Sequence, residues 1–572
     1  MIERRLVRLK NLRAGLLWLL AGAACNSGTE PHFRPCTAVD AAVSLGVNQY
    51  VSLDPAVDTG CMVFPATTLP AAYLLVPQIT SGVPGQVATF RLKGDTILPA
   101  PAPSAPVPET AVELSPAEAF HQYLRLGDER RSWGFAPQAK AAPPPPSGVA
   151  PLRSSAAGPP AMGSRRVFQV CAKTDCSRFD AVVARVRALK SKVAIYVDSL
   201  APAGGLDSTT LDGIADLFDQ QLYAVDTAAF GRESDIDANT VVMVLMTNTV
   251  NKLVTKVQCN NGFVAGFFFG ADLDPAFQND KRSNKGEVFY SIVADPAGTL
   301  SCPHPASDVQ KFVPVTFIHE FQHMISFNQH VLMRGGGGEV LWLNEGFSHY
   351  AEELGGRSYA LAPDAKLADC TIGQSDCRFY GGDLLDAYEF MDSSSKHFLL
   401  PTVGIGSLAE RGAAWLFVRY VVDQYAAGNT RTEWNALTRS LIGTAQTGAQ
   451  NIATVTGDPF STVVTRWALA LYATDGGGTP PELQYDSWNL HAVYSSLHTQ
   501  SPNVFKKFYP LQPPSLVARN MNLIGTLHAG AGIYLSATQP ANDPGFTLSF
   551  TAQNGAPIDA QFGPRMTIMR LQ

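Results

Sequence analysis

The chain has 572 residues, of which 46% are hydrophobic and 16% are charged. This length is enough for roughly three to five domains, and the hydrophobic share is enough for at least one large core. The formal net charge is −6, which excludes a generally basic nucleic-acid-binding protein. After the first 24 residues no stretch has 18 consecutive apolar residues, so we expect no membrane-spanning helix.

Residues 1–24 have the pattern of a secretory signal. Basic residues precede an apolar run, Ala14–Ala24, which is too short to span a bilayer. The run ends in small residues directly before Cys25, as in a bacterial lipoprotein signal. We therefore expect a protein of the bacterial cell envelope that touches the membrane only through a lipid on Cys25. Free secretion, after ordinary cleavage next to residues 21–23, is the alternative.

The cysteine content predicts an oxidising compartment. Nine cysteines are present, and setting Cys25 aside leaves eight that fall into neighbouring pairs along the chain. Several disulfides are typical of secreted and envelope proteins. Other pairings, or free thiols, are the alternative. The expected disulfides are Cys36–Cys61, Cys171–Cys176, Cys259–Cys302 and Cys370–Cys377.

The N-terminal part of the mature chain predicts a small β-sandwich over residues 25–97. Its short apolar runs are separated by turn residues, as expected for strands. The runs lie at 43–47, 50–53, 72–76 and 87–92. Residues 98–165 form a proline-rich linker, whose composition favours extended segments. Within it, Ser115 begins a short helix that we expect to end near Arg130.

Residues 166–475 form the largest predicted domain, with a mixed α/β lobe followed by a helical lobe. The first lobe alternates strands with helices, and the chain is mainly helical from residue 308. The expected strands are 167–170, 193–197 and 241–246, and the expected helices are 181–190 and 211–223. Residues 476–572 form a linker and a C-terminal β-domain with strands at 533–537 and 546–550. The fold class is therefore multidomain α+β.

Oxygen-bearing side chains alternate in the segment directly before the strand at 241–246. Asp235, Asp237 and Asn239 resemble the opening of a calcium-binding loop. The segment lacks the glycine and the closing glutamate of that motif, so a polar turn is the alternative. Calcium is thus a possible second cofactor.

One motif carries more chemical information than any other, His319-Glu320-Phe321-Gln322-His323. On a helix, residues four apart lie on the same face, so both imidazoles can bind one zinc ion. Glu320 lies about 100° around the helix, where it can accept a proton from a metal-activated water. Apolar neighbours predict that this helix is buried, where two imidazoles and a carboxylate would be costly without a function.

A third zinc ligand is expected from a second helix. Glu345 lies 22 residues after His323, in the run Trp-Leu-Asn-Glu-Gly-Phe. The glycines of 334–338 predict a chain reversal that lets the two helices pack side by side. Two histidines and a glutamate leave one position of a tetrahedral zinc ion for water, as in catalytic zinc sites.

These motifs resemble those of the gluzincin-type zinc metallopeptidases, and most closely the bacterial hyicolysin-type (M30) peptidases. The resemblance also includes Phe230-Gly-Arg-Glu-Ser-Asp-Ile-Asp and Ser283-Asn-Lys-Gly-Glu, and it covers roughly residues 166–475. It implies zinc proteolysis, with His319, His323 and Glu345 as ligands and Glu320 as general base. The aspartate that orients a ligand histidine in related motifs is replaced here by His349, so Glu352 is a candidate for that role.

The residue that stabilises the oxyanion is left open among His349, Tyr380 and Arg411. The predicted function is a secreted or lipid-anchored zinc metalloendopeptidase, active as a monomer on protein or peptide substrates. Its first alternative is a catalytically weak surface protein that uses the peptidase fold as a binding scaffold. An exopeptidase is a third possibility, but no recognisable motif for a substrate amine supports it. No nucleic-acid partner is expected.

Overall fold

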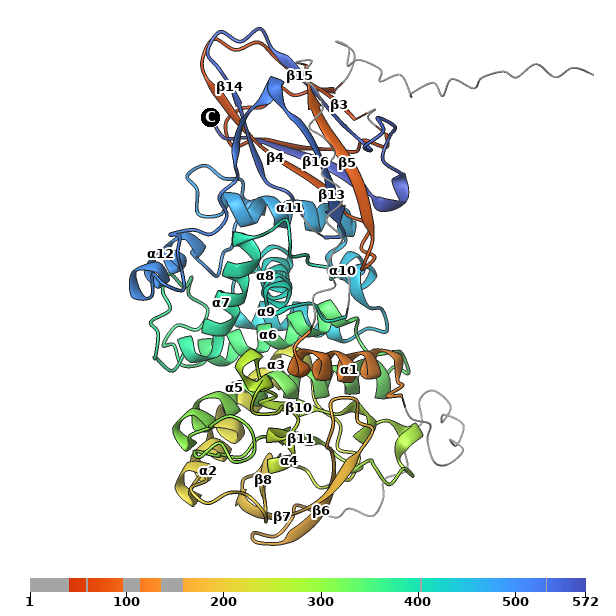
Figure 1. Cartoon of the computed structure of the whole chain (residues 1–572), viewed down its shortest axis with the longest axis vertical. Coiled ribbons are helices and arrows are strands. Elements are labelled where there is room, and N and C mark those ends of the chain that lie inside the picture. The colour runs from red at the N-terminus through yellow and green to blue at the C-terminus, as the bar shows by residue number, and fades with distance from the viewer. Residues whose placement is uncertain (1–40, 58–59, 96–113, 135–157, 402–403, 531) are drawn as a thin grey trace, which may run out of the picture.

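The computed structural model describes residues 41–57, 60–95, 114–134, 158–401, 404–530 and 532–572. The signal segment, Cys25, Cys36 and both proline tracts of the linker lie outside these residues, so the predictions made for them stay predictions. Figure 1 shows three parts along the long axis, namely a β-sandwich, a layer of helices and a mixed sheet with its own helices. The protein is therefore of mixed α and β structure with several sheets, as the fold class predicts.

The mixed sheet has six strands in the order β10-β11-β9-β8-β7-β6. Strands β8, β9 and β11 are parallel to one another, and the remaining pairs are antiparallel. The strands are β6 (Arg165–Cys171), β7 (Phe179–Leu189), β8 (Val193–Asp198), β9 (Val242–Met246), β10 (Gly266–Phe268) and β11 (Val288–Ser291). Three of them match the expected strands at 167–170, 193–197 and 241–246.

The prediction of a helix at 181–190 is wrong, because this segment forms strand β7. Its side chains alternate between buried and exposed from Ala181 to Ala188, which is the period of a strand and not of a helix. Val182, Val186 and their neighbours pack on the core, while Arg185 and Arg187 face outward. The β-branched valines and the two-residue period were the signal for the correct assignment.

Most of the remaining chain is helical, as expected from residue 308 onward. The predicted helix at 211–223 is present and continues through a π turn at Phe218–Leu222 into the next helix. The helix expected after Ser115 is also present, with Ser115 and Glu118 forming a capping box. The helices are α1 (Pro116–Arg130), α2 (Ser208–Leu217), α3 (Tyr223–Phe230), α4 (Asn248–Asn251), α5 (Ala306–Phe327), α6 (Leu341–Arg357), α7 (Cys377–Asp392), α8 (Leu408–Tyr425), α9 (Arg431–Ile442), α10 (Gly448–Thr456), α11 (Phe460–Ala473) and α12 (Leu490–Gln500).

The β-sandwich differs from the two separate β-domains that we expected. Its sheets have the orders β1-β3-β15-β5-β13 and β12-β14-β4-β16-β2, so strands from both ends of the chain share each sheet. Strand β4 pairs on both sides with C-terminal strands, which supply hydrogen-bond partners that the N-terminal segment lacks. The strands are β1 (Ala41–Ala42), β2 (Tyr50–Leu53), β3 (Cys61–Phe64), β4 (Ala71–Ile79), β5 (Val87–Gly94), β12 (Ser515–Val517), β13 (Asn522–His528), β14 (Leu535–Gln539), β15 (Phe546–Thr551) and β16 (Pro564–Arg570).

Smaller features of the fold follow the predictions in part. The expected strand at 43–47 is absent, since those residues lie in the connection between β1 and β2.

Among the described residues, no helix has the length and apolar character needed to cross a bilayer. Three of the expected disulfides are confirmed, and the fourth involves Cys36, outside the described ranges. The confirmed disulfides are Cys171–Cys176, Cys259–Cys302 and Cys370–Cys377.

Candidate functional site

The histidine motif lies in the C-terminal half of the buried helix α5. Phe317 stacks on Phe218 with ring centroids 3.9 Å apart, and Phe321 packs edge-on against the same ring. These contacts hold one side of α5 against the mixed sheet and its helices. His319 and His323, four residues apart, therefore point together toward the neighbouring helix α6.

Helix α6 supplies Glu345 from its first turns. The reversal expected at 334–338 is present, and α5 and α6 pack against each other. Gly338 is required there, because a Cβ atom at this position would lie 2.7 Å from the backbone oxygen of Asp128 on α1. The loop thus lets α1 come close to both helices of the site.

The three expected ligands converge on one point. The Nε2 atoms of His319 and His323 are 3.2 Å apart; Glu345 Oε2 lies 3.7 Å from the first, and Glu345 Oε1 lies 3.5 Å from the second. Two ligands each about 2.0–2.1 Å from a tetrahedral zinc ion lie about 3.4 Å from each other. The observed separations are close to this requirement, and two imidazole nitrogens with a carboxylate form a donor set that zinc accepts.

Each histidine is oriented by a partner on α6. The Nδ1 atom of His319 lies 2.7 Å from Glu352 Oε1, and that of His323 lies 3.0 Å from Asn344 Oδ1. With Nδ1–H donating to these oxygens, each Nε2 presents a lone pair toward the common point. Glu352 makes the contact that its predicted orienting role requires, whereas Asn344 was not singled out from the sequence.

The charge on Glu345 is stabilised by cationic neighbours. Burial by itself would raise the pKa of this carboxyl, but nearby positive charge, chiefly that of Arg411, lowers it to about 2. Glu345 Oε1 is buried and has no hydrogen-bond partner among the described residues. An ionised carboxylate oxygen in such a place is available to a cation.

Glu320 faces the edge strand β10 and helix α1. Its Oε2 atom accepts a hydrogen bond of 2.8 Å from the backbone N–H of Phe268 and lies 3.6 Å from Arg125 Nη2. The Arg125 side chain is completely buried and also donates to the Phe268 carbonyl oxygen at 2.8 Å. Burial raises the pKa of Glu320, and the charge of Arg125 opposes that shift.

Arg125 was missed in the sequence analysis, although the helix that carries it was predicted. The buried face of α1 includes Phe120, Leu124, Arg125 and Asp128, at helical spacing. An arginine on the apolar face of an amphipathic helix needs a buried anionic partner. That spacing was the signal that could have placed Arg125 next to a carboxylate.

Two of the three oxyanion candidates lie at the site. His349 bonds through Nδ1 to Asp383 at 2.7 Å, and its buried Nε2 has no partner among the described residues. Although burial disfavours the charged form, Asp383 and Glu352 hold the pKa of His349 well above its usual value. Arg411 Nε lies 3.9 Å from Glu345. Tyr380 instead donates to Asp376.

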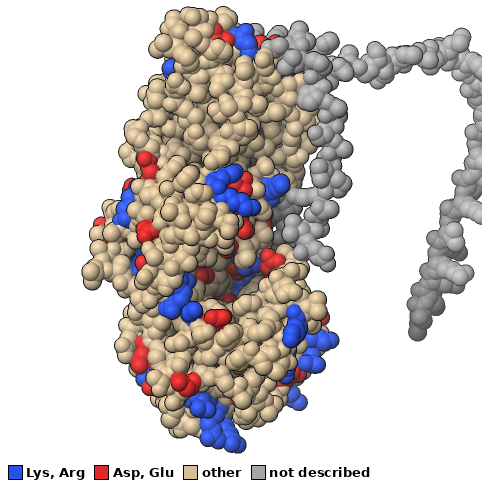
Figure 2. Space-filling model, turned by 60° about the vertical axis from the view of Figure 1, so that its left-hand side comes forward, with Lys and Arg blue, Asp and Glu red and all other residues tan. Residues whose placement is uncertain are grey.

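The surface is hollowed at the height of this site. Figure 2 shows a recess between the helical layer and the part that contains the mixed sheet, at the level where α1 and α6 lie in Figure 1. Acidic and basic side chains are visible inside it. The histidine motif lies on α5 and Glu345 on α6.

The possible calcium ligands are rearranged relative to the prediction. Asp235 and Asp237 lie together, but Asn239 accepts a hydrogen bond from the Val241 backbone through Oδ1 and donates to Asp237. The third acidic side chain is Glu287, directly before β11, and the three carboxylates have oxygens within 4.8 Å of one another. Glu287 belongs to the run Ser283-Asn-Lys-Gly-Glu of the family resemblance, but it is 50 residues away from Asp237, and no local spacing indicated that the two runs meet.

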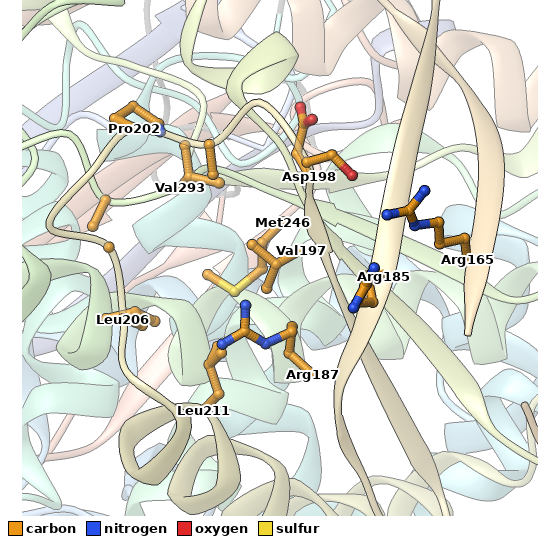
Figure 3. Close-up of a pocket in the computed structure, with 14 residues that line it drawn as sticks. Arg165, Arg185, Arg187, Val197, Asp198, Pro202, Leu206, Leu211, Met246 and Val293 are labelled. Carbon is orange, nitrogen blue, oxygen red and sulfur yellow. The ribbon is translucent and has the colours of Figure 1, made fainter. Parts of the chain in front are cut away.

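A separate cavity of about 470 Å³ lies at the ends of β8 and β9 (Figure 3). Arg165, Arg185 and Arg187 line one side, and Arg187 reaches toward Leu211 and Met246. Arg165 and Arg185 are direct partners on β6 and β7, so two like charges face each other across the strands. None of the predicted site residues lines this cavity.

Comparison with known proteins supports the same general chemistry. No protein-family model matches the sequence. Part of the chain is similar to the neutral metalloprotease ShpI of Staphylococcus hyicus, with 29% identity over 142 residues. The match covers 25% of this chain and 30% of that protease, so the chain has a counterpart to less than a third of its length. This similarity is evidence for a metallopeptidase, and it reaches no finer class.

Proposed function

We propose that this protein is a zinc metalloendopeptidase of the gluzincin type. The observation that carries the proposal is the convergence of His319, His323 and Glu345, with Glu320 next to the first ligand. The ligand separations and the orienting contacts of Glu352 and Asn344 support zinc as the metal. The similarity to a neutral metalloprotease supports peptide hydrolysis as the reaction.

The residues of the chain then have distinct roles. His319, His323 and Glu345 would hold the zinc ion, which would supply polarisation of the peptide carbonyl and a lowered pKa, toward about 7, for water. Glu320 accepts the proton of the attacking water and returns it to the leaving amine. His349, whose pKa is raised and whose Nε2 has no partner among the described residues, is the group that we assign to the developing oxyanion, and Arg411 is the second candidate.

Helix α1 covers the general base in this structure. Both polar backbone groups of Phe268 are engaged, since its N–H donates to Glu320 and its carbonyl oxygen accepts from Arg125. An extended peptide added to the edge of β10 would need those same groups. We therefore expect α1 to shift at Arg125 when a substrate binds.

The binding-scaffold alternative is less well supported by the geometry. A scaffold needs neither a metal triad nor a buried carboxylate beside it, and Glu320 is only 1% exposed. Keeping such a group ionised requires the buried Arg125, which is an expensive arrangement without a chemical role. These observations favour catalysis over passive binding.

The test is the variant Glu320→Gln, which keeps the side-chain volume and removes the proton acceptor. We expect it to fold, to keep its zinc and to lose peptidase turnover by about 10²–10⁴-fold. Digestion of a peptide library, read by mass spectrometry, measures the activity and separates internal cleavage from trimming at the ends. Zinc content is measured on the same preparation.

The matched control is Glu389→Gln, which changes an exposed glutamate on α7. It should cleave like the wild-type protein. If Glu320→Gln retains zinc and cleaves within about threefold of the control, Glu320 is not the base and the proposed mechanism fails, because loss of a general base costs far more than this. A wild-type protein that holds zinc but cuts no peptide would favour the binding scaffold.

A further inference from the structure

A second group of possible metal ligands lies outside the proposed catalytic site. We call Asp235, Asp237 and Glu287 the acidic cluster; their carboxylate oxygens lie within 4.8 Å of one another. The two aspartates belong to the loop before β9, and Glu287 directly precedes β11. Strands β9 and β11 are parallel neighbours, so their amino ends bring together two motifs that are far apart in the sequence. The proposed peptidase chemistry uses none of these side chains.

Glu287 is the member of the acidic cluster that most needs a partner. Its side chain is 1% exposed. One carboxylate oxygen, Oε1, accepts hydrogen bonds from the Ser234 hydroxyl and from the Ile236 backbone N–H. The other oxygen, Oε2, is buried and has no hydrogen-bond partner in the described part of the chain. A buried carboxylate oxygen without a partner is costly, and two neighbouring carboxylates add repulsion.

The charge balance around the acidic cluster indicates a divalent cation. The charge of Arg232 acts on Asp235, and Arg166 lies beside Asp237, with its Nη1 atom 3.7 Å from Oδ2 of that aspartate. The other guanidinium contacts of Arg166 are with the sulfur of Met243 and the backbone oxygen of Asn284. Three carboxylates against these two arginines leave negative charge that a divalent cation can compensate.

The donor atoms identify which divalent ion fits. All three side chains offer carboxylate oxygen, and none offers nitrogen or sulfur. Calcium prefers six to eight oxygen ligands and commonly uses aspartates at alternate positions together with a glutamate that binds through both oxygens. Asp235 and Asp237 have that spacing, and Glu287 supplies the glutamate from another strand. Zinc, by contrast, is suited to the nitrogen-containing set on α5 and α6.

We propose that Asp235, Asp237 and Glu287 bind one Ca²⁺ ion, which joins the loop before β9 to the start of β11. The ion compensates the charge of the buried Glu287 and fixes the relative position of two central strands. Strand β11 also pairs with β10, the strand that contacts Glu320. The site is thus structural, and it does not depend on the proposed peptidase function.

The test uses the purified full-length protein with its zinc content monitored throughout. Calcium is first removed with a chelator selective for Ca²⁺ over Mg²⁺, and CaCl₂ or MgCl₂ is then added back. We expect isothermal titration calorimetry to show one equivalent of bound Ca²⁺ and weaker binding of Mg²⁺. Because a ligand that binds only the folded state stabilises it, Ca²⁺ should raise the unfolding temperature by about 2 °C or more. No calcium binding by the wild-type protein would overturn the proposal.

The variant Glu287→Gln makes the test specific to this cluster, with Glu389→Gln as the control. The variant should bind Ca²⁺ at least about tenfold more weakly than the control, since it loses a charged ligand that calcium sites rely on. Without calcium, it should unfold at the same temperature as the wild-type protein or at a higher one, because the unpaired buried carboxylate is gone. Unchanged calcium affinity in Glu287→Gln would place the ion elsewhere. If Asp237→Asn, whose side chain is partly exposed, also leaves the affinity unchanged, the acidic cluster is not a calcium site.

Discussion

The histidine site and the acidic cluster are built in different ways. His319, His323 and Glu345 lie on two packed helices, and both histidines have a partner that orients them. The acidic cluster instead joins a loop to the start of a strand, and Asp235 is exposed to solvent. Each group has an arginine at a similar distance from a carboxylate, 3.6 Å for Arg125 and 3.7 Å for Arg166.

Burial separates these two arrangements. The Arg125 side chain is completely buried, whereas that of Arg166 is 31% exposed. Charge interactions are strong where water is excluded and weak where it screens them. The histidine site therefore depends on a set of buried charges that contact one another, while the acidic cluster depends mainly on the ion that it is proposed to bind.

The largest effect is expected from removing a ligand of the histidine site. Glu345→Gln replaces the charged ligand by an amide, which binds zinc poorly, so we expect loss of zinc and of peptidase activity. The loss should exceed the roughly 10–100-fold typical of a partner that only orients a ligand. Zinc content by elemental analysis and peptide cleavage are the measurements. Normal zinc content in this variant would show that Glu345 is not a ligand.

The buried arginine should matter more for stability than the partly exposed one. Arg125→Met leaves Glu320 and Asp128 without their buried cation, so we expect it to lower the free energy of unfolding by about 3–5 kcal/mol. Arg166→Met should cost about 1 kcal/mol or less, because its ion pair is partly exposed. Chemical denaturation of both variants compares them directly. An equal loss of unfolding free energy in both variants would show that burial does not make the Arg125 ion pair more important than that of Arg166.

A smaller effect is expected from the residue that orients His319. Glu352→Gln still offers an oxygen to Nδ1 but removes the charge that makes the imidazole a stronger ligand. Zinc affinity or activity should fall by about 10–100-fold, less than in Glu345→Gln. Competition with a chromogenic zinc chelator measures the affinity. An effect as large as that of Glu345→Gln would mean that Glu352 itself binds the metal.

The two sites also differ in how far they could be predicted from sequence. The histidine motif is local, because residues four apart on a helix share a face wherever the helix lies in the fold. Glu345 was inferred one helix later, from a short glycine loop between two apolar segments. The acidic cluster was identified only in part. Asp235 and Asp237 are two residues apart and were both predicted as calcium ligands. The third predicted ligand was Asn239, whereas in the structure the third acidic side chain is Glu287, which lies near the aspartates because β9 pairs with β11.

The secondary structure shows the same dependence on distance along the chain. The helix at α1 was predicted because its capping box lies within four residues. Strand β7 was read as a helix because its alanines and arginines are common in helices, although the two-residue alternation favours a strand. The sequence predicted two separate β-domains instead of one sandwich, because pairing between strands at opposite ends of the chain leaves no local pattern.

The amino-acid sequence alone was enough to predict the motif at His319–His323, several of the helices and three disulfides, of which two join cysteines five and seven residues apart. Apart from the Cys259–Cys302 disulfide, which spans 43 residues, these features depend on residues that are near one another and whose geometry the backbone of one helix or loop sets. Only the tertiary structure decided that α1 covers Glu320, that Glu287 joins Asp235 and Asp237, and that both ends of the chain form one sandwich. These contacts form when segments far apart in the sequence pack together, bury apolar surface and pair their buried charges. The local spacing of residues does not predict which segments will pack together.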